Sequence, residues 1–302
     1  MDHLNEKVAF VTGGASGIGL GIATACVEAG MRVVIADLRP DHIHAAMSGF
    51  AANGHARQVT AIQLDVTDRK AMARAADEAW RVFGKVHLPV LNAGVGVVGP
   101  VKDATYADWD FGLGVNLGGT INGLVTFLPR MFAQGEGGHL VVTSSQAGIT
   151  PAPRNAAIYA TGKAALVGMC EAIREELADE GIGVSVLLAG FFRTNIHEAG
   201  RNRPERFREG SGYVAVEAKM SEGADSPIWR DPLDCGRMVL DAVRQDQLYI
   251  ATHGELKGWA EGRFEQILAA FPPPRDPALA RAMGRRRPAN PIAVRPEAED
   301  GG

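Results

Sequence analysis

Short, mostly apolar runs alternate with longer helical stretches along this 302-residue chain. The apolar runs occupy residues 7–11, 32–36, 61–64, 86–91, 139–143, 183–188 and 248–251. Runs of this length without polar alternation are typical of strands that are buried on both faces. Since helical stretches separate the runs, we expect an α/β protein built on a doubly wound parallel sheet, with its ligands at the carboxyl ends of the strands.

The alternation predicts one folding unit, with two segments that depart from it. We expect a single domain over residues 1–271, because no internal repeat or second unit is visible. Residues 191–230 mix charged and aromatic side chains, which suits either a mobile substrate lid or a solvated pair of surface helices. Residues 272–302 are rich in proline and arginine, so we expect an extended or disordered C-terminal tail.

A glycine-rich turn joins the first apolar run to the first helical stretch. It contains Gly13, Gly17 and Gly19, with Ser16 and Ile18 on either side of the middle glycine. Glycine lets the backbone approach a ligand closely, so that amide N–H groups and the positive end of the helix face a bound phosphate. Alone the pattern can be a tight turn, but the strand before it and the helix and strand after it predict a dinucleotide site of the Rossmann type.

Asp37 ends the second apolar run, 18 positions after Gly19. A carboxylate at this place in a dinucleotide-binding fold accepts hydrogen bonds from the adenosine ribose and repels a 2′-phosphate. The sequence therefore predicts NAD as the cofactor in preference to NADP. Arg39 keeps NADP open, since a nearby arginine can bind the extra phosphate, and Asp37 can also be interpreted as a helix cap or turn residue.

Further candidates for cofactor binding follow the other strands of the predicted sheet. They are Asp65, Val66, Asn92, Ala93, Gly94, Gly190, Phe192 and Thr194. Asp65 could hydrogen-bond an adenine or merely cap a helix, although Asp68 is better placed as the cap. The small residues at 92–94 could admit a ribose or form an ordinary turn. Their convergence on one edge of the sheet favours the binding role.

Tyr159 and Lys163 stand four positions apart at the start of a helical stretch, so they share one helix face. An ammonium favours a phenolate, so we expect Lys163 to lower the pKa of Tyr159 from about 10 toward neutrality, where an acid/base catalyst works best. Ser144 and Ser145 end the preceding strand, and one hydroxyl could hold a substrate oxygen beside the phenol. The pair alone is also common on exposed helices.

Asn116 lies within the helical region 103–131, although asparagine is unfavourable inside helices. Two explanations are open: a buried hydrogen bond of purely structural value, or a water molecule held for proton relay. The second explanation would add Asn116 to the catalytic set of Ser145, Tyr159 and Lys163.

Composition and charge argue against several classes of function. A net charge of −4 argues against a nucleic-acid-binding surface, and no apolar run reaches the ~18 residues that a membrane span needs. The N-terminal residues lack the layout of a secretion signal. Cys26, Cys170 and Cys235 form neither a disulfide framework nor a metal-ligand pattern, so we expect buried thiols, no metal site and a cytoplasmic protein.

Together these motifs resemble the short-chain dehydrogenase/reductase family over about residues 5–255. The shared elements are the turn at 12–19, Asn92-Ala93-Gly94, Asn116, a serine and Tyr159-x-x-x-Lys163. The resemblance implies that Tyr159 is the general acid/base, that Lys163 lowers its pKa and holds the nicotinamide ribose, and that Ser145 orients the substrate oxygen. It also implies a water-holding role for Asn116 and a contact of Thr194 with the carboxamide or pyrophosphate.

The sequence departs from the family pattern in three places. Ser145 lies one residue further from Tyr159 than is usual, so Ser144 stays a candidate. Ala189-Gly190 replaces the usual Pro-Gly after the sixth strand, which loosens that turn. Leu91 replaces the first asparagine of the frequent Asn-Asn-Ala-Gly, while the second is kept.

A weaker likeness concerns Ser211-Gly212-Tyr213-Val214, the last strand and the C-terminal extension. These resemble bacterial dehydrogenases of benzylic alcohols in lignin-derived aryl ethers. We therefore expect an NAD-dependent oxidoreductase that interconverts a bulky, aromatic secondary alcohol and its ketone, as a homodimer or homotetramer. An NADP-dependent ketone reductase and a non-catalytic dinucleotide-binding sensor are the alternatives. A sensor usually loses the tyrosine or the lysine, and an epimerase would need a larger C-terminal domain than residues 255–302 can form.

Overall fold

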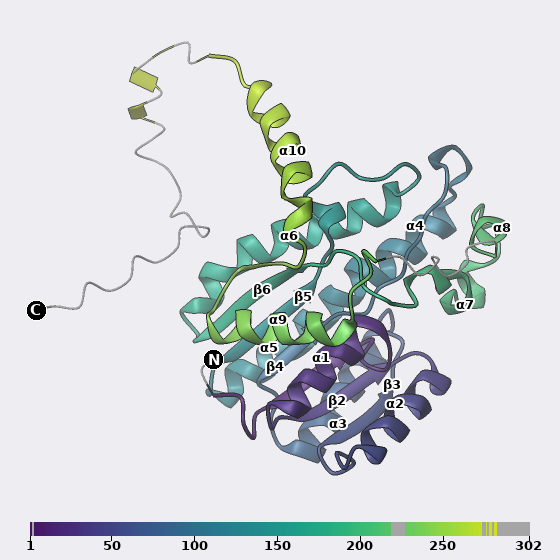
Figure 1. The fold of residues 1–302 in the computed structure, drawn as a ribbon, viewed down its shortest axis with the longest axis vertical. Coiled ribbons are helices and arrows are strands. Elements are labelled where there is room, and N and C mark those ends of the chain that lie inside the picture. The colour runs from purple at the N-terminus through teal and green to yellow at the C-terminus, as the bar shows by residue number, and fades with distance from the viewer. Residues whose placement is uncertain (2, 219–226, 274–275, 277, 280, 283–302) are drawn as a thin grey trace, which may run out of the picture.

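The computed structural model describes residues 1, 3–218, 227–273, 276, 278–279 and 281–282 (Figure 1). Part of the predicted lid at 191–230 and most of the predicted tail at 272–302 lie outside these residues. The described strands form one parallel sheet in the order β3-β2-β1-β4-β5-β6-β7. They are β1 (Val8–Thr12), β2 (Arg32–Asp37), β3 (Val59–Gln63), β4 (Leu88–Leu91), β5 (Gly138–Thr143), β6 (Ile182–Leu188) and β7 (Tyr249–Ala251). The strand order reverses between β1 and β4, so the predicted doubly wound fold is confirmed.

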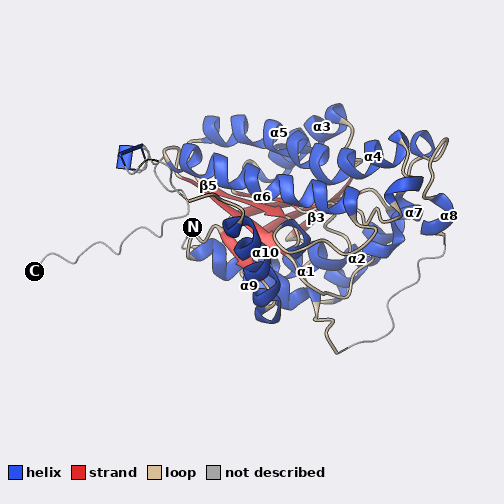
Figure 2. Cartoon of the chain, turned by 90° about the horizontal axis from the view of Figure 1, so that it is seen from above, coloured by secondary structure: helices blue, strands red, loops and turns tan. Residues whose placement is uncertain are grey.

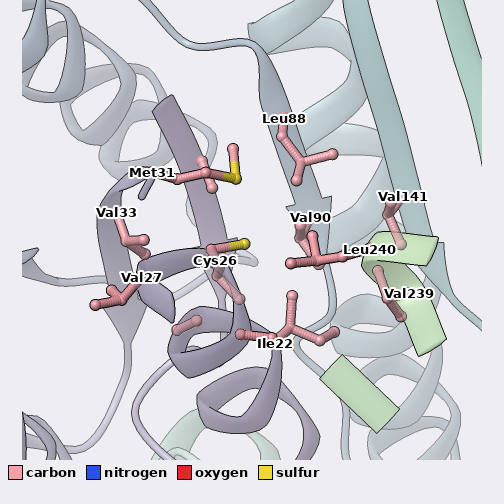
Figure 3. Packing of buried hydrophobic residues seen from close by; sticks show 14 of the residues in the cluster. Ile22, Cys26, Val27, Met31, Val33, Leu88, Val90, Val141, Val239 and Leu240 are labelled. Carbon is pink, nitrogen blue, oxygen red and sulfur yellow. The ribbon is translucent and has the colours of Figure 1, made fainter. Parts of the chain in front are cut away.

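Helices cover both faces of the sheet, which gives three layers (Figure 2). One face carries α1 (Gly17–Glu28), α2 (Pro40–Ala52) and α9 (Pro232–Arg244), and the other carries α3 (Arg69–Phe83), α4 (Tyr106–Leu113), α5 (Gly119–Gln134) and α6 (Ala157–Ala178). Ile22 of α1, Val90 of β4 and Leu240 of α9 are buried together on the first face (Figure 3). Phe10 and Phe127 pack on the second, with ring centroids 4.6 Å apart. Burial on both faces explains why the strands lack polar alternation.

Several short elements and the C-terminal helix α10 lie outside these layers. They are η1 (Val101–Asp103), η2 (Gly114–Gly118), η3 (Gln146–Gly148), η4 (Ile196–Glu198), α7 (Ala199–Asn202), η5 (Glu205–Phe207), α8 (Val214–Glu217), η6 (Gly254–Leu256) and α10 (Lys257–Ala269). Helix α10 follows β7 and projects away from the sheet (Figure 1). We call residues 191–218 and 227–230, which interrupt the alternation after β6, the post-β6 segment.

The region predicted as two helical stretches at 103–131 is one continuous helical rod. Its middle turn, η2, is a π-helix that joins α4 to α5 and contains Asn116. A π-turn widens the helix by one residue and is frequent at functional sites. By length and a mean hydropathy of 1.3, the rod Tyr106–Gln134 could cross a membrane. Half of its most apolar window is buried inside the protein, as expected for a core helix, so it is weak evidence for a span.

A buried ion cluster ties the post-β6 segment to α4. The Arg203 guanidinium donates to a Glu217 carboxylate oxygen at 2.9 Å and lies 3.2 Å from a carboxylate oxygen of Asp108. The Ser211 hydroxyl donates to Asp108 at 2.6 Å, and the Gly212 N–H donates to it at 3.0 Å. The three ionised side chains are at most 1% exposed. This part of the segment is therefore fixed to the main body by charges that water does not reach.

Candidate active site

A cavity of about 410 Å³ lies at the carboxyl ends of the central strands. Every residue that the sequence predicted to bind the cofactor lines it: Gly13, Ser16, Gly17, Ile18, Gly19, Asp37, Asp65, Val66, Asn92, Ala93, Gly94, Tyr159, Lys163, Gly190, Phe192 and Thr194. Ser145 lines the same cavity, whereas Asn116 does not. The structure thus brings together the predicted nucleotide residues and most of the predicted catalytic residues.

The glycine-rich turn has the shape of a phosphate cradle. Gly13 and Gly17 adopt φ values of +62° and +50°, which L side chains rarely adopt. A Cβ atom on Gly19 would lie 2.0 Å from the Gly13 carbonyl oxygen, so only glycine fits there. Ser16 precedes α1 without a side-chain cap, which leaves the first N–H groups of the helix for a ligand. These residues fit the pyrophosphate of a dinucleotide.

Asp37 is largely buried at the end of β2, where its carboxylate braces the glycine-rich turn. One oxygen accepts from the Ala15 N–H and the other from the Arg39 N–H, each at 3.1 Å. These two bonds support the interpretation of Asp37 as a turn residue. Asp37 also lines the cavity, where a bound ribose would lie. Arg39 also lines the cavity, but its guanidinium is already paired with Asp41 and with Glu198.

Asn92 joins the ends of three neighbouring strands. Its side-chain N–H donates to the Thr12 carbonyl at 3.0 Å, and its side-chain oxygen accepts from the Thr143 hydroxyl at 3.1 Å. The backbone N–H groups of Asn92 and Ala93 both donate to the Thr12 hydroxyl. These bonds fix the floor of the cavity between β1, β4 and β5.

Asp65 lies where β3 leaves the sheet and does not cap α3. Asp68 is the cap, since its carboxylate accepts from the first N–H groups of that helix. Asp65 instead accepts from Thr67 and pairs with Arg206 of the post-β6 segment at 2.8 Å. Burial alone would raise the pKa of Asp65, but the hydrogen bonds from Arg206 and Thr67 hold it below its usual value.

Asn116 is fully buried and clamps the π-turn onto the chain that follows β4. Its side-chain oxygen accepts from the Val95 N–H and its side-chain N–H donates to the Val95 carbonyl, both at 2.9 Å. The structural explanation for a mid-helix asparagine is therefore sufficient. A part for Asn116 in proton relay stays a prediction.

The two serines after β5 have different surroundings. The Ser144 hydroxyl donates to the Lys163 carbonyl at 2.7 Å, so it ties the strand end to α6. The Ser145 hydroxyl accepts from the Ala147 N–H and donates to the Ala189 carbonyl at 3.4 Å, and it lies close enough to the Tyr159 phenol to favour the phenolate. Of the two candidates, Ser145 is the serine beside the phenol.

Tyr159 and Lys163 point into the same part of the cavity from one face of α6. The Lys163 ammonium lies 5.7 Å from the centre of the Tyr159 ring and donates to the Thr143 carbonyl at 2.8 Å. Because this ammonium is removed from water, burial lowers its pKa to about 8.

The expected lowering of the Tyr159 pKa by Lys163 is wrong for the protein without cofactor. Burial raises the pKa of Tyr159 above its ordinary value, and the nearby Ser145 hydroxyl offsets only part of that rise. The physical reason is that the surrounding protein desolvates the phenolate, while the Lys163 ammonium is committed to Thr143.

Some cavity residues were not among the predicted site residues. Those with polar or aromatic side chains include His42, Gln146, Asn195, Asn202 and Trp229. The side-chain oxygens of Gln146 and Asn202 are buried without a hydrogen-bond partner. Gln146 could have been found from its place directly after Ser145, whereas the others come from segments without a motif.

Metal chemistry has no visible basis in the described residues, which contain no group of three or more His, Cys, Asp or Glu side chains suited to a metal ion. The three cysteines are buried free thiols. Burial raises the pKa of each thiol, Cys26, Cys170 and Cys235, to about 12, so none is a ready nucleophile.

Comparison with known proteins agrees with this geometry. The family model for short chain dehydrogenases matches residues 7–205. A C alpha-dehydrogenase from Sphingobium sp. strain SYK-6 is 38% identical over 280 residues, which cover 90% of this chain and 89% of that protein. The structure of a short-chain dehydrogenase/reductase from Burkholderia phymatum in complex with NAD superposes with a TM-score of 0.83 at 30% identity, covering 91% of this chain and 99% of that one. The apo form of LigO from strain SYK-6 gives 0.77 at 39% identity, covering 95% and 97%.

The fold and the site define an oxidoreductase that binds a dinucleotide at the carboxyl edge of a doubly wound sheet. The chain belongs to the short-chain dehydrogenase/reductase family. It is accordingly an NAD(P)-dependent oxidoreductase of the alcohol dehydrogenase type that acts on a small-molecule substrate.

Proposed function

We propose that the protein is an NAD-dependent dehydrogenase that interconverts a bulky aromatic secondary alcohol and its ketone. The observation that carries this proposal is the position of Tyr159. Its phenol lies beside Ser145 and shares one cavity with the glycine-rich turn and Asp37. A proton-transfer group and a nucleotide cradle in one cavity are what hydride transfer to or from an alcohol carbon requires.

Different residues of this chain would bind the cofactor and transfer the proton. A nicotinamide cofactor, when bound, accepts or supplies the hydride. The glycine-rich turn would hold the pyrophosphate, Asp37 the adenosine ribose and Lys163 the nicotinamide ribose. Tyr159 takes the hydroxyl proton in oxidation and returns it in reduction, while Ser145 fixes the reacting oxygen. Thr194, which lies against Gly17, would meet the cofactor beside the turn.

The lining of the cavity supports a bulky aromatic substrate. Phe191, Phe192, Ile196 and Trp229 all contribute to it, and the rings of Phe191 and Trp229 meet edge to face with centroids 5.8 Å apart. The unpartnered oxygen of Gln146 suits a hydroxyl donor on the substrate. One relative is named a C alpha-dehydrogenase, which agrees with the likeness to benzylic-alcohol dehydrogenases.

The function is tested by following NADH absorbance with a panel of secondary alcohols, from small aliphatic alcohols to benzylic alcohols that carry an aryl ether. We expect turnover with NAD⁺ to be fastest for the benzylic alcohols. Tight NAD⁺ binding without turnover of any alcohol would instead favour a dinucleotide-binding sensor. Faster turnover of the small aliphatic alcohols would rule out the aromatic assignment.

Asp37→Ala should shift cofactor preference from NAD⁺ toward NADP⁺. Removal of the carboxylate deletes an acceptor for the ribose and a repulsive charge for a 2′-phosphate, so we expect the ratio of kcat/KM values to change by about tenfold or more. The measurement is the rate with each cofactor at one alcohol concentration. Asp37→Asn is the companion variant, because it removes the charge while keeping an acceptor for the Ala15 N–H. A wild-type enzyme that already prefers NADP⁺ would contradict our interpretation of Asp37.

The two reaction directions should differ in pH dependence. Alcohol oxidation needs the deprotonated phenol, and because burial holds the pKa of Tyr159 high, its phenolate fraction grows about tenfold per pH unit in the neutral range. We therefore expect kcat/KM for oxidation to rise at about that rate from pH 6 to 8. Ketone reduction should stay nearly flat over this range, and oxidation that slows as pH rises would contradict the assigned base.

We also propose that the protein forms a homodimer or homotetramer through α4 and α5. Apolar side chains on α5, among them Ile121, Val125 and Phe132, are exposed in the single chain. Light scattering after gel filtration measures the oligomeric state, and a monomer at micromolar concentration would contradict it. A cytoplasmic location, a lid function for residues 191–230 and a separate tail at 272–302 stay predictions.

A further inference from the structure

Two ion pairs join the post-β6 segment to the strand ends that face the adenosine half of the proposed cofactor. Glu198 pairs with Arg39, which follows β2, at 2.7 Å. Arg206 pairs with Asp65, which follows β3, at 2.8 Å, and also donates to the Thr67 hydroxyl. The segment predicted to cover the substrate is therefore in contact with the nucleotide end of the cavity as well.

Arg39 is held between two carboxylates. Its guanidinium donates to Asp41, whose side chain is 62% exposed, and to Glu198 of the post-β6 segment, whose side chain is 16% exposed. Glu198 in turn accepts from Arg201 at 2.8 Å. Asp41 accepts two hydrogen bonds from Arg39, but it is exposed, and since exposed ion pairs contribute little, a phosphate can displace Asp41 more easily than the shielded Glu198.

Glu198 has anchors other than Arg39, among them its pair with Arg201. It directly precedes α7, and the nearby buried cluster around Arg203 fixes the segment to α4. A group that is held in place by the rest of the fold can neutralise Arg39 without needing Arg39 for its own position.

We propose that Glu198 determines cofactor choice by occupying Arg39. A 2′-phosphate is a dianion and needs a free cation, and in this cavity it would meet the Asp37 carboxylate and an arginine whose charge is already compensated. Two effects therefore disfavour NADP⁺. The Asp37 carboxylate at the end of β2 repels the 2′-phosphate, and Glu198 compensates the charge of the arginine that would otherwise bind it. This inference rests on the proposed preference for NAD.

The test measures binding of two probes that carry only the adenosine end, 5′-AMP and adenosine 2′,5′-bisphosphate, by isothermal titration calorimetry. Glu198→Gln keeps the shape and removes the charge, so we expect it to bind the bisphosphate at least about fivefold more tightly than wild type. Its affinity for 5′-AMP should stay within about twofold. Glu205→Gln is the matched control, because Glu205 lies in the same segment, is 91% exposed and pairs only loosely with Arg208 at 3.7 Å.

The double variant Arg39→Ala/Glu198→Gln identifies the group that receives the phosphate. We expect the double variant to bind the bisphosphate no more tightly than wild type, because the tighter binding of Glu198→Gln requires the guanidinium of Arg39. An unchanged bisphosphate affinity in Glu198→Gln, or a gain that survives in the double variant, would overturn the inference while leaving the NAD assignment intact. A wild-type protein that binds the bisphosphate more tightly than 5′-AMP would overturn the NAD assignment itself. Glu198→Ala is the second variant and should show the same gain.

Discussion

Changing Tyr159 to phenylalanine should lower kcat/KM for alcohol oxidation by about 10²- to 10⁴-fold, the range that general acid/base catalysis contributes. The ring stays in place because only the hydroxyl is removed, while the hydroxyl proton of the substrate loses its acceptor. The affinity for NAD⁺, measured by quenching of intrinsic fluorescence, should change by no more than about twofold. Loss of one hydroxyl from a partly exposed ring costs no more than about 1 kcal/mol in the free energy of unfolding, so the variant remains folded.

The matched control for this variant is Tyr106→Phe. Tyr106 is 90% exposed at the start of α4, so its hydroxyl has no part in the cavity and its loss should leave kcat/KM unchanged. Activity of Tyr159→Phe close to that of wild type would rule out the assigned acid/base. Loss of NAD⁺ binding together with activity would show that Tyr159 acts through the cofactor pocket and not through proton transfer.

Local patterns predicted those parts of the site that depend on neighbouring residues in the chain. The glycine-rich turn needs Gly17 and Gly19 for backbone reasons that the sequence exposes directly, because a strand precedes it and a helix follows. Asp37 and Ser145 were found because parallel strands deliver their carboxyl ends to one edge. Tyr159 and Lys163 were found because helical spacing puts them on one face.

Properties that depend on contacts distant in sequence were not predicted. The pKa of Tyr159 follows from burial by several elements, and no spacing rule reports how much water reaches the phenol. A buried hydrogen bond was one of the two explanations for Asn116, but neither its partner Val95 nor the π-turn that contains Asn116 was predicted from the sequence. The pairing of Arg39 with Glu198 joins residues 159 positions apart, so the sequence alone left Arg39 free to bind a phosphate.

The second large effect is expected from the buried cluster that Arg203 forms with Asp108 and Glu217. Arg203→Met should lower the free energy of unfolding by about 3–5 kcal/mol, because it leaves the carboxylates of Asp108 and Glu217 buried without their cation. Urea unfolding followed by circular dichroism measures the loss. Arg201→Met is the control in the same segment, since its pair with Glu198 has a 71% exposed arginine and should be worth less than about 1 kcal/mol.

The same substitution separates the anchoring of the segment from the chemistry of the site. Arg203 itself does not line the cavity. The cluster around it holds the post-β6 segment, and Phe191, Ile196 and Trp229 of that segment do line the cavity. Below the unfolding transition we therefore expect Arg203→Met to raise KM for a bulky alcohol more than it lowers kcat, because the proton-transfer group is untouched. Equal loss in kcat and kcat/KM would place the cluster in the catalytic step. A free energy of unfolding within about 1 kcal/mol of wild type would mean that the segment is fixed by its apolar contacts and not by these buried charges.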